Sequence, residues 1–193
     1  MISVPTLKNI EDITALMQES PFHMEALRTV ETLDLPELWV AAGFVRNYVW
    51  DRLHGYKNPT PLNDIDVIYY DTANQNEDFE KQQEFRLNAL MPGPNWSVKN
   101  QARMHLKNND PSYQSLEHAL CHWCETVTPI GAKLGKDETI SIIAPLGITD
   151  LIHMECHPTP FAKKNPEKMR HYKQRMRDKK WWELWPKVTV YDL

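Results

Sequence analysis

The segment NDIDVIYYD, residues 63–71, constrains the fold more than any other part of the sequence. Apolar, β-branched and aromatic residues alternate there with period two, which predicts a β-strand. Residues two apart in a strand point to one face, so Asp64 and Asp66 should project together while Ile65 and Val67 face the core. Two adjacent carboxylates repel and raise each other's pKa unless a cation lies between them. Because Mg²⁺ and Mn²⁺ prefer such oxygens, the pair predicts a metal site.

A turn with little side-chain bulk lies upstream of this strand, in the segment AAGF that ends at Phe44. Apolar residues then recur at every fourth position as far as Leu53, which predicts a helix that ends near Gly55. The N-terminus of a helix binds phosphate where the backbone can approach closely, so we expect Gly43 and neighbouring amides to cradle phosphate. Arg46 adds a bidentate donor suited to the same group. A phosphate cradle followed by a metal-binding carboxylate pair is what phosphoryl transfer requires.

Each of these residues also has an interpretation without a catalytic role. The aspartate pair could lie on a solvated strand face, and Gly43 could form an ordinary tight turn. Arg46 could make a surface salt bridge, for example to Asp51. Asn47 suits a polar contact inside the helix as well as a role in the site, so the local pattern leaves its assignment open.

The segments AAGFVRNYVWDRLHG and DIDVIYYD together resemble the DNA polymerase beta superfamily of nucleotidyltransferases over about residues 36–72. They are most similar to the branch with poly(A) polymerases and CCA-adding enzymes, whose pattern is a Gly-Gly-x-Val-Arg-Asp turn and helix followed by Asp-x-Asp. Over about residues 10–190 the chain is similar to a family of small, poorly characterised bacterial nucleotidyltransferase-like proteins, in which GFVRN, DIDV, VKNQARMH and APxGxxDL recur together. The resemblance implies Mg²⁺-dependent transfer of a nucleoside monophosphate from a nucleoside triphosphate (NTP) to an acceptor, with release of pyrophosphate.

The sequence departs from the superfamily pattern in the turn and the helix. Ala42 stands where the first glycine of the pattern lies, and Asn47 replaces the aspartate. The loop between the helix and the DID motif is also longer than in the pattern. We still expect Gly43, Arg46 and Asn47 to contact the nucleotide.

The superfamily also implies a third carboxylate on a later strand, which would complete the catalytic set with Asp64 and Asp66. The segment TISII is the strand at that place, and it offers Ser141 rather than an acid. Asp71, Asp150 and Glu155 are the nearest alternatives. We expect Asp150 to be the third catalytic acid, because it follows the glycine turn of APLGIT and begins an expected strand over residues 150–160.

The segment WSVKNQARMH, residues 96–105, is expected to form a strand on which Lys99, Gln101 and Arg103 share one face. Such charges can protect an exposed sheet edge from pairing with another chain. The recurrence of VKNQARMH in the similar family favours a second interpretation, in which Lys99 and Arg103 contact the nucleotide or the acceptor.

The segment HALCHWCET contains a Cys-x-x-Cys pair, Cys121 and Cys124. A zinc site of the ribbon type needs a second pair of ligands at similar spacing, and Cys156 and His157 lie beyond an expected hairpin. A catalytic Cys-His pair would need a turn that presents the thiol, and none is evident. We interpret both cysteines as small apolar residues on a buried helix face.

The remaining segments predict a mixed α/β layer fold. We expect a partly antiparallel sheet with helices packed largely on one face and extra helices at both termini. Two short helices should fill residues 9–31, with a break before Pro21. The other expected helices span residues 76–91, 115–126 and 165–186, and a hairpin spans residues 130–145.

The composition bounds the class of protein. The net charge of −4 excludes a strongly basic nucleic-acid footprint over the whole chain, although the C-terminal part is locally basic. No apolar run reaches the roughly 18 residues that span a bilayer, and the N-terminal sequence lacks the layout of a signal peptide. The odd number of cysteines argues against a disulfide framework. We therefore expect a cytoplasmic protein without a membrane partner.

We expect one nucleotidyltransferase-like domain over residues 1–193, with a core at about 36–160 and a basic, tryptophan-rich helical extension at about 161–193. The implied partners are an NTP and an acceptor that is a small molecule, an RNA or a protein. A rival hypothesis is a regulatory module that binds the nucleotide without turnover. A third is an RNA-binding module that uses the C-terminal helix, whose affinity would fall with salt.

Overall fold

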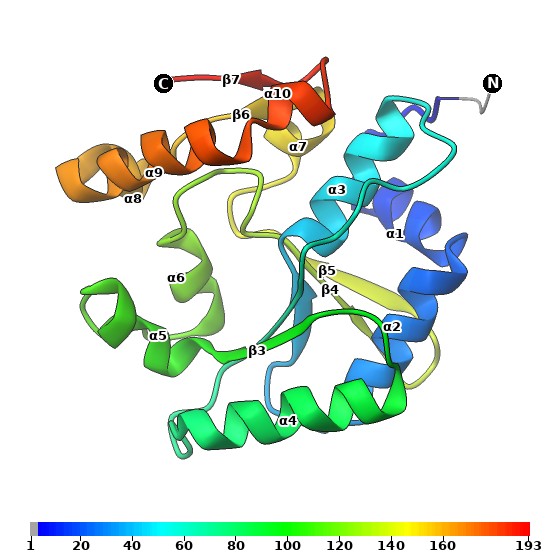
Figure 1. The fold of residues 1–193 in the computed structure, drawn as a ribbon, viewed down its shortest axis with the longest axis vertical. Coiled ribbons are helices and arrows are strands. Elements are labelled where there is room, and N and C mark those ends of the chain that lie inside the picture. The colour runs from blue at the N-terminus through cyan, green and yellow to red at the C-terminus, as the bar shows by residue number, and fades with distance from the viewer. Residues whose placement is uncertain (1–3) are drawn as a thin grey trace.

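The computed structural model describes residues 4–193 of the chain. Within them, a sheet of five strands has the order β3-β2-β1-β4-β5 (Figure 1). The strands are β1 (Trp39–Ala41), β2 (Ile65–Tyr69), β3 (Trp96–Asn100), β4 (Gly131–Leu134) and β5 (Ile140–Ile143). β2 and β3 are parallel, whereas β1 pairs antiparallel with β2 and β4, and β4 pairs antiparallel with β5. The predicted mixed sheet and the predicted hairpin are therefore confirmed.

Four helices cover one face of this sheet, as predicted. They are α1 (Ile10–Gln18), α2 (Pro21–Glu31), α3 (Gly43–Leu53) and α4 (Glu77–Leu90). Val40 of β1, Val67 of β2 and Val98 of β3 are fully buried against this helical layer. Leu27 of α2 and Val49 of α3 belong to the same core. The buried sheet face thus consists of residues that alternate along each strand.

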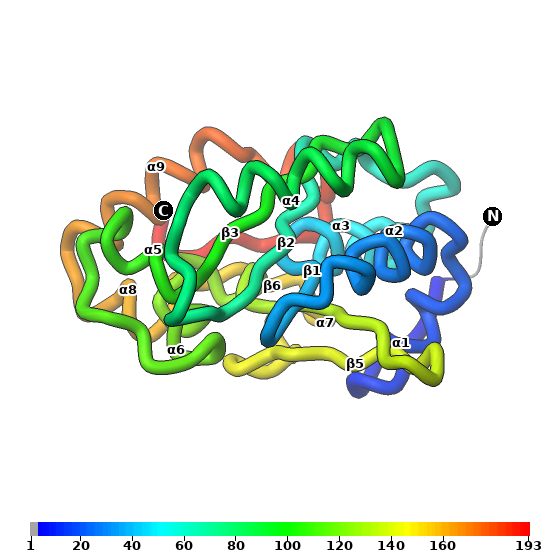
Figure 2. Tube along the Cα trace, turned by 90° about the horizontal axis from the view of Figure 1, so that it is seen from below, coloured from blue at the N-terminus to red at the C-terminus, as the bar shows by residue number. Residues whose placement is uncertain are grey.

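The opposite face of the sheet packs against a smaller apolar cluster. Ile68 of β2 and Ile143 of β5 pack there with Leu116 and Leu120 of α6 (Leu116–Cys121). Figure 2 shows α4 and α6 on opposite sides of β2. Asp66 is two residues from Ile68 on β2 and shares this second face, so its carboxylate lies outside the main core.

Two predicted helix starts are set by local caps. Ser20 accepts a hydrogen bond from the third residue of α2 at 3.4 Å, and Ser115 caps α6 in the same way at 3.1 Å. α6 ends at Cys121, short of its predicted length. The chain beyond it is held by a β-bridge between Glu125 and Pro158, so Cys124 does not lie on the helix.

The predicted strand over residues 96–105 is wrong in its second half. β3 ends at Asn100, and α5 (Gln101–Asn108) begins at once. The Asn100 side chain explains the switch, since its oxygen accepts a hydrogen bond from Ala102 N at 3.0 Å and caps α5. Its amide nitrogen donates to the carbonyl oxygens of Asp71 and Asn74 at 2.7 and 2.8 Å, which ties the cap to the loop after β2.

The predicted strand over residues 150–160 is also wrong. Asp150 lies in the first turn of a short helix, α7 (Thr149–His153), and only β6 (Glu155–Cys156) is extended. Met154 between them has a φ of 59°, which reverses the chain direction. β6 pairs with β7 (Thr189–Val190) in a separate two-stranded sheet and not with β2.

The C-terminal part of the chain is helical, as predicted, but in several pieces. These are α8 (Pro160–Lys164), α9 (Pro166–Lys179) and α10 (Trp181–Leu184). Tyr172, Trp181 and Trp185 join the core cluster that contains Val67. In residues 4–193, no helix has the length and apolar character that crossing a bilayer requires.

Candidate active site

The two aspartates of the DID motif lie at the N-terminal end of β2. Asp64 is exposed just before the strand, and Asp66 is half-buried within it. Asp66 lies opposite Ala41 of β1 and Ser97 of β3, and Ala41 lies opposite Gly131 of β4. Because these neighbours have small side chains or none, they leave room for a ligand on the sheet beside the Asp66 carboxylate.

The two carboxylates interact electrostatically, as the sequence predicts. Burial, with the charge of Asp64 as the second cause, raises the pKa of Asp66 to about 6. The cations Arg46, Arg175 and Lys179 act against this shift of the Asp66 pKa. Since the shift persists with three cations nearby, the pair would be stabilised by a divalent cation bound directly to its oxygens.

The turn before α3 has an unusual backbone. α3 begins at Gly43, and no side chain caps its first turn. Ala42 has φ 55° and ψ −120°, a region that glycine adopts without strain. The Ala42 N–H donates a hydrogen bond at 2.8 Å to the carbonyl oxygen of Ile130, the residue just before β4. The first turn of α3 therefore keeps backbone donors available for an anion.

Ala42→Val is expected to destabilise the protein by about 2 kcal/mol or more, because a β-branched residue at positive φ is strained. Ala42→Gly should stay within about 1 kcal/mol of the parent, since relief of strain offsets the added freedom of the unfolded chain. Urea unfolding of the three proteins measures both values. Equal stability of the valine variant and the parent would show that this turn is not strained.

Arg46 is buried beneath the site, with 6% of its surface exposed. Its guanidinium lies 4.2 Å from the ring centre of Trp181 and 5.6 Å from that of Trp50. It donates hydrogen bonds to Thr128 Oγ1 at 3.2 Å and to Asn47 Oδ1 at 2.9 Å. Burial lowers the pKa of Arg46 to about 10, and the charge of nearby acids opposes this. Arg46 therefore joins α3 to the C-terminal helices.

The alternative partner of Arg46, Asp51, has a different environment. Asp51 is buried and accepts hydrogen bonds from Trp185 Nε1 and Thr60 N, both at 2.7 Å. Within residues 4–193 it forms no ion pair with Arg46. The interpretation of Arg46 as a surface residue paired with Asp51 is therefore wrong.

Lys99 and Arg103 lie on different elements, so the predicted shared strand face is wrong. Lys99 on β3 donates to Glu84 Oε1 of α4 at 2.8 Å. Arg103 on α5 donates to both carboxylate oxygens of the fully buried Glu80, at 3.1 and 2.7 Å. The same two acids accept from backbone N–H groups at the edge of β3, so α4 covers that edge. Contact of either cation with a nucleotide stays a prediction.

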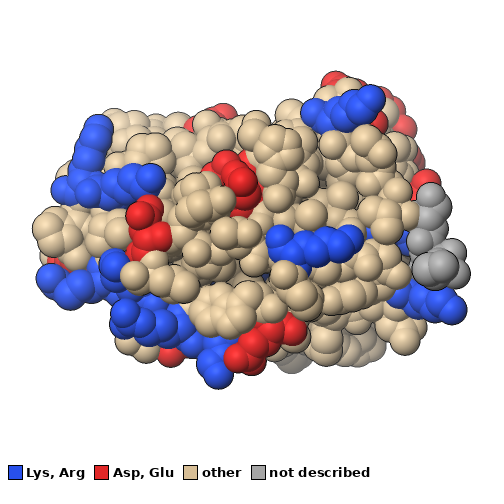
Figure 3. Space-filling view, turned by 90° about the horizontal axis from the view of Figure 1, so that it is seen from above, with Lys and Arg blue, Asp and Glu red and all other residues tan. Residues whose placement is uncertain are grey.

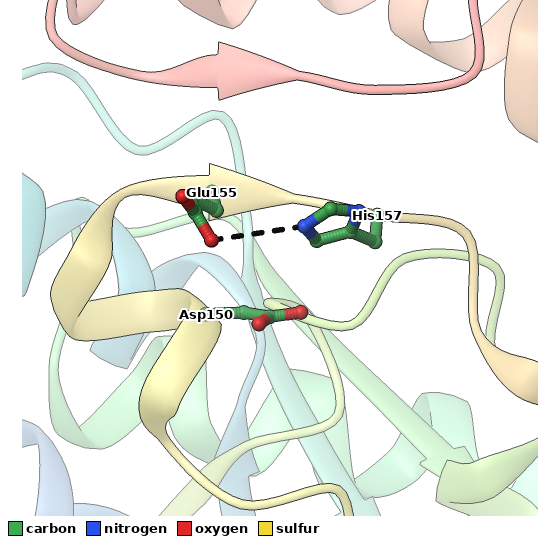
Figure 4. Close-up of side chains that lie close together, drawn as sticks. All are labelled: Asp150, Glu155 and His157. Carbon is green, nitrogen blue, oxygen red and sulfur yellow. Dashed lines mark ion pairs between the residues drawn. The ribbon is translucent and has the colours of Figure 1, made fainter.

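The expected third acid, Asp150, does not form a close group of ligand atoms with the DID pair. Asp150 is grouped with Glu155 and His157, whose ligand atoms all lie within 4.8 Å of one another (Figure 4). In residues 4–193 this is the one group of three potential metal ligands, and it contains neither Asp64 nor Asp66. Ser141 on β5 is exposed and lies opposite Lys133. The site therefore brings together two carboxylates.

Asp71, the other alternative, follows the C-terminal end of β2, whereas the DID pair lies at the N-terminal end of that strand. One of its carboxylate oxygens accepts a hydrogen bond from Ala73 N at 2.8 Å. Asp71 therefore caps a turn.

α9 contributes cations near Asp66 that the sequence pattern does not predict. Arg175 and Lys179 both act on the pKa of Asp66. Arg175 also forms an ion pair with the buried Glu125. Figure 3 shows Lys and Arg side chains gathered at the end of the molecule where α8 and α9 lie. No local motif reveals this placement, because nearly a hundred residues separate the end of β2 from the start of α9.

A cavity of about 720 Å³ lies on the helical side of the sheet, between α2, α3 and the loops near residues 56–62 and 91–95. Asn47 and Ile65 line it, and the DID carboxylates do not. The Asn47 amide also lies 3.6 Å from the position that a Cβ would take at Gly43. Asn47 thus lines the cavity and also lies beside the turn at Gly43.

Comparison with solved structures shows the same fold elsewhere. An NMR structure, described as revealing a CCA-adding enzyme head domain, is 30% identical, with a TM-score of 0.87 over 99% of this chain and 100% of that chain. A CCA-adding enzyme in complex with CTP is 14% identical, with a TM-score of 0.54. The match covers 92% of this chain and 43% of that chain, so this chain corresponds to less than half of that enzyme.

The sequence comparisons agree with the structural ones. No curated protein matches the chain. A family model described as nucleotidyltransferase matches residues 28–190, which is most of the sequence. Because this match includes the GFVRN turn and the DID strand, and because the head-domain structure shares sequence and fold over nearly the whole chain, the protein belongs to the nucleotidyltransferase family.

Proposed function

We propose that this protein transfers a nucleoside monophosphate from an NTP to an acceptor, in a Mg²⁺-dependent reaction that releases pyrophosphate. The observation that carries the proposal is the raised pKa of Asp66, about 6, beside Asp64 and three cations. Carboxylates that repel each other on an open sheet face suit a divalent ion with phosphate ligands. The CTP in the similar CCA-adding enzyme supports an NTP as the donor.

The donor set fits Mg²⁺ or Mn²⁺. Asp64 and Asp66 offer hard oxygen ligands from one strand end, and Mg²⁺ is often held by one or two carboxylates together with substrate phosphates. When bound, such an ion neutralises charge on the phosphates and activates the acceptor oxygen. Asp64 and Asp66 would hold it, and the amides at Gly43 would orient the triphosphate.

The surrounding cations have different parts in this proposal. Arg46 is buried against Trp181 and hydrogen-bonded to Asn47, so it would stabilise the turn at Gly43 from the protein interior. Arg175 and Lys179 bring positive charge that acts on Asp66. Lys99 and Arg103 would reach a nucleotide or acceptor only by breaking their ion pairs with α4.

A module that binds nucleotide without turnover is the second candidate. The observation that favours it is the group of ligands at Asp150: within residues 4–193 it is the one group of three with ligand atoms within 4.8 Å of one another, and it lacks both DID aspartates. A third acid would hold a second ion for in-line displacement. A single ion held by two carboxylates is enough for binding, so the two candidates differ in turnover alone.

The test measures binding and turnover separately. Calorimetry with Mg²⁺ and each of the four NTPs gives affinity, and pyrophosphate release in the presence of small-molecule, RNA and protein acceptors gives transfer. Asp64→Asn should lose both, and Asp78→Asn, which removes an exposed carboxylate on α4, should lose neither. Binding without pyrophosphate release would favour the module. Absence of Mg²⁺-dependent binding would contradict both candidates.

A further inference from the structure

We propose that Asp150, Glu155 and His157 form a second metal site, which binds a divalent transition-metal ion, foremost Zn²⁺. The site lies where α7 meets β6, and it shares no residue with the DID pair. The proposal does not depend on the nucleotidyl-transfer activity.

The backbone brings the three side chains together. Glu155 and His157 are two residues apart on an extended segment, so they point the same way. The reversal at Met154 returns this segment past the first turn of α7, where Asp150 lies. Figure 4 shows the three side chains converging on one space, with His157 Nε2 at 3.8 Å from Glu155 Oε2. All three ligand atoms lie within 4.8 Å of one another.

Contacts from outside the group hold the imidazole and one carboxylate. The Tyr191 ring, next to β7, stacks on the His157 ring at 4.1 Å with an interplanar angle of 13°. The Tyr191 hydroxyl donates to Glu155 Oε1 at 3.4 Å. Thr126 fixes the backbone of His157 through hydrogen bonds at 2.9 and 3.3 Å. Metal-binding histidines and carboxylates are commonly oriented by such outer partners.

The charge of the group is not balanced by the protein. Two acids whose side chains have little exposed surface pair with a cation: Glu80 with Arg103, and Asp110 with Lys168. Within residues 4–193, Asp150 forms no ion pair, and the single ion-pair partner of Glu155 is His157. Two half-buried carboxylates therefore face one imidazole, which a divalent cation would neutralise.

The donor atoms decide between classes of ion. An imidazole nitrogen with two carboxylate oxygens suits Zn²⁺, which often has three protein ligands and an open position, better than Mg²⁺, which prefers oxygen ligands. Zn²⁺ also binds nitrogen and oxygen ligands more tightly than Mn²⁺ or Fe²⁺. Bond lengths of about 2.0–2.2 Å require the three side chains to close by roughly 1 Å, which small χ rotations supply.

The experiment titrates chelator-treated, full-length protein with ZnCl₂ by calorimetry, with Co²⁺ absorption as a probe of the ligands. We expect one Zn²⁺ per chain and a rise of about 5 °C in Tm, because the ion binds the folded state alone. Asp150→Asn and His157→Gln should each lower the affinity at least tenfold. Circular dichroism of both variants shows whether they are folded.

Three controls locate the ion. His153→Gln removes an exposed histidine of α7 and should leave the affinity unchanged. The double variant Asp64→Asn, Asp66→Asn and the variant Cys124→Ser should also bind Zn²⁺ like the parent. The proposal is wrong if the parent shows no saturable Zn²⁺ binding, if folded His157→Gln binds like the parent, or if the double variant or Cys124→Ser loses the ion.

Discussion

Asp66→Asn is expected to abolish Mg²⁺-dependent nucleotide binding, to lower transfer more than a hundredfold, and yet to stabilise the metal-free protein. The loss of function follows because the amide cannot replace a charged metal ligand, which is worth several kcal/mol. The gain in stability follows because folding raises the pKa of Asp66 from 3.8 to about 6. The folded protein therefore prefers the neutral side chain, and asparagine is neutral at every pH.

The pH dependence gives the sign of this effect. A raised pKa in the folded state contributes stability that is fully present below the unfolded value of 3.8 and is lost as pH rises through about 6. Above pH 6 the charged side chain costs the metal-free parent on the order of 3 kcal/mol. Asp66→Asn should remove this pH dependence. Mg²⁺ affinity of the parent should fall as pH drops below about 6.

Urea unfolding in EDTA at pH 5 and pH 8 measures the stability of the parent and the variant, and calorimetry measures Mg²⁺-NTP binding. Asp78→Asn is the matched control, since it removes one exposed carboxylate at a distance from the site. If Asp66→Asn bound Mg²⁺ and NTP like the parent, the metal assignment would be wrong. If its stability at pH 8 fell instead, the carboxylate would be stabilising the fold.

Arg46→Ala is expected to lower the free energy of unfolding by about 3 to 5 kcal/mol. The change removes a buried side chain that packs on Trp181 and Trp50 and donates to Thr128. Arg46→Met keeps much of the buried volume and removes the charge. Because burial lowers the pKa of Arg46 to about 10, the charge itself is costly there, and the methionine variant should lose less than half as much.

The pair of variants separates packing from phosphate binding. Denaturant unfolding gives the stabilities, and NTP affinity is measured on Arg46→Met at a temperature where it is folded. If Arg46 only stabilises the turn at Gly43 and does not contact the NTP, the NTP affinity should fall less than tenfold. A loss of more than a hundredfold in a folded Arg46→Met protein would show that the guanidinium binds the substrate directly.

The DID strand and the turn-helix at Gly43 could be predicted because their signals are local. The strand period of β2 places Asp64 and Asp66 together, and the helical spacing from Gly43 to Leu53 defines α3. The break before Pro21 and the hairpin of β4 and β5 are local in the same sense. Period, capping and turn residues act over a few positions, so they can be read along the chain.

The misplaced elements depend on partners far away in the sequence. Asn100 stops β3 and starts α5 while its side chain is held by the carbonyl oxygens of Asp71 and Asn74. A stretch that suits either a strand or a helix is thus decided by a tertiary hydrogen bond. Asp150 follows a glycine turn as a strand would, but it lies in the short helix α7, and the turn at Met154 brings Glu155 and His157 close to it.

By itself, the sequence determined the local pattern of the candidate site: two carboxylates two residues apart at one strand, preceded by a turn and a helix. Only the tertiary structure decided which cations serve it. Arg46 is buried because Trp181 of α10 packs on it, and the charges of Arg175 and Lys179 on α9 act on the pKa of Asp66. The physical reason is that burial and electrostatic contacts depend on distance in space, which local periodicity does not encode.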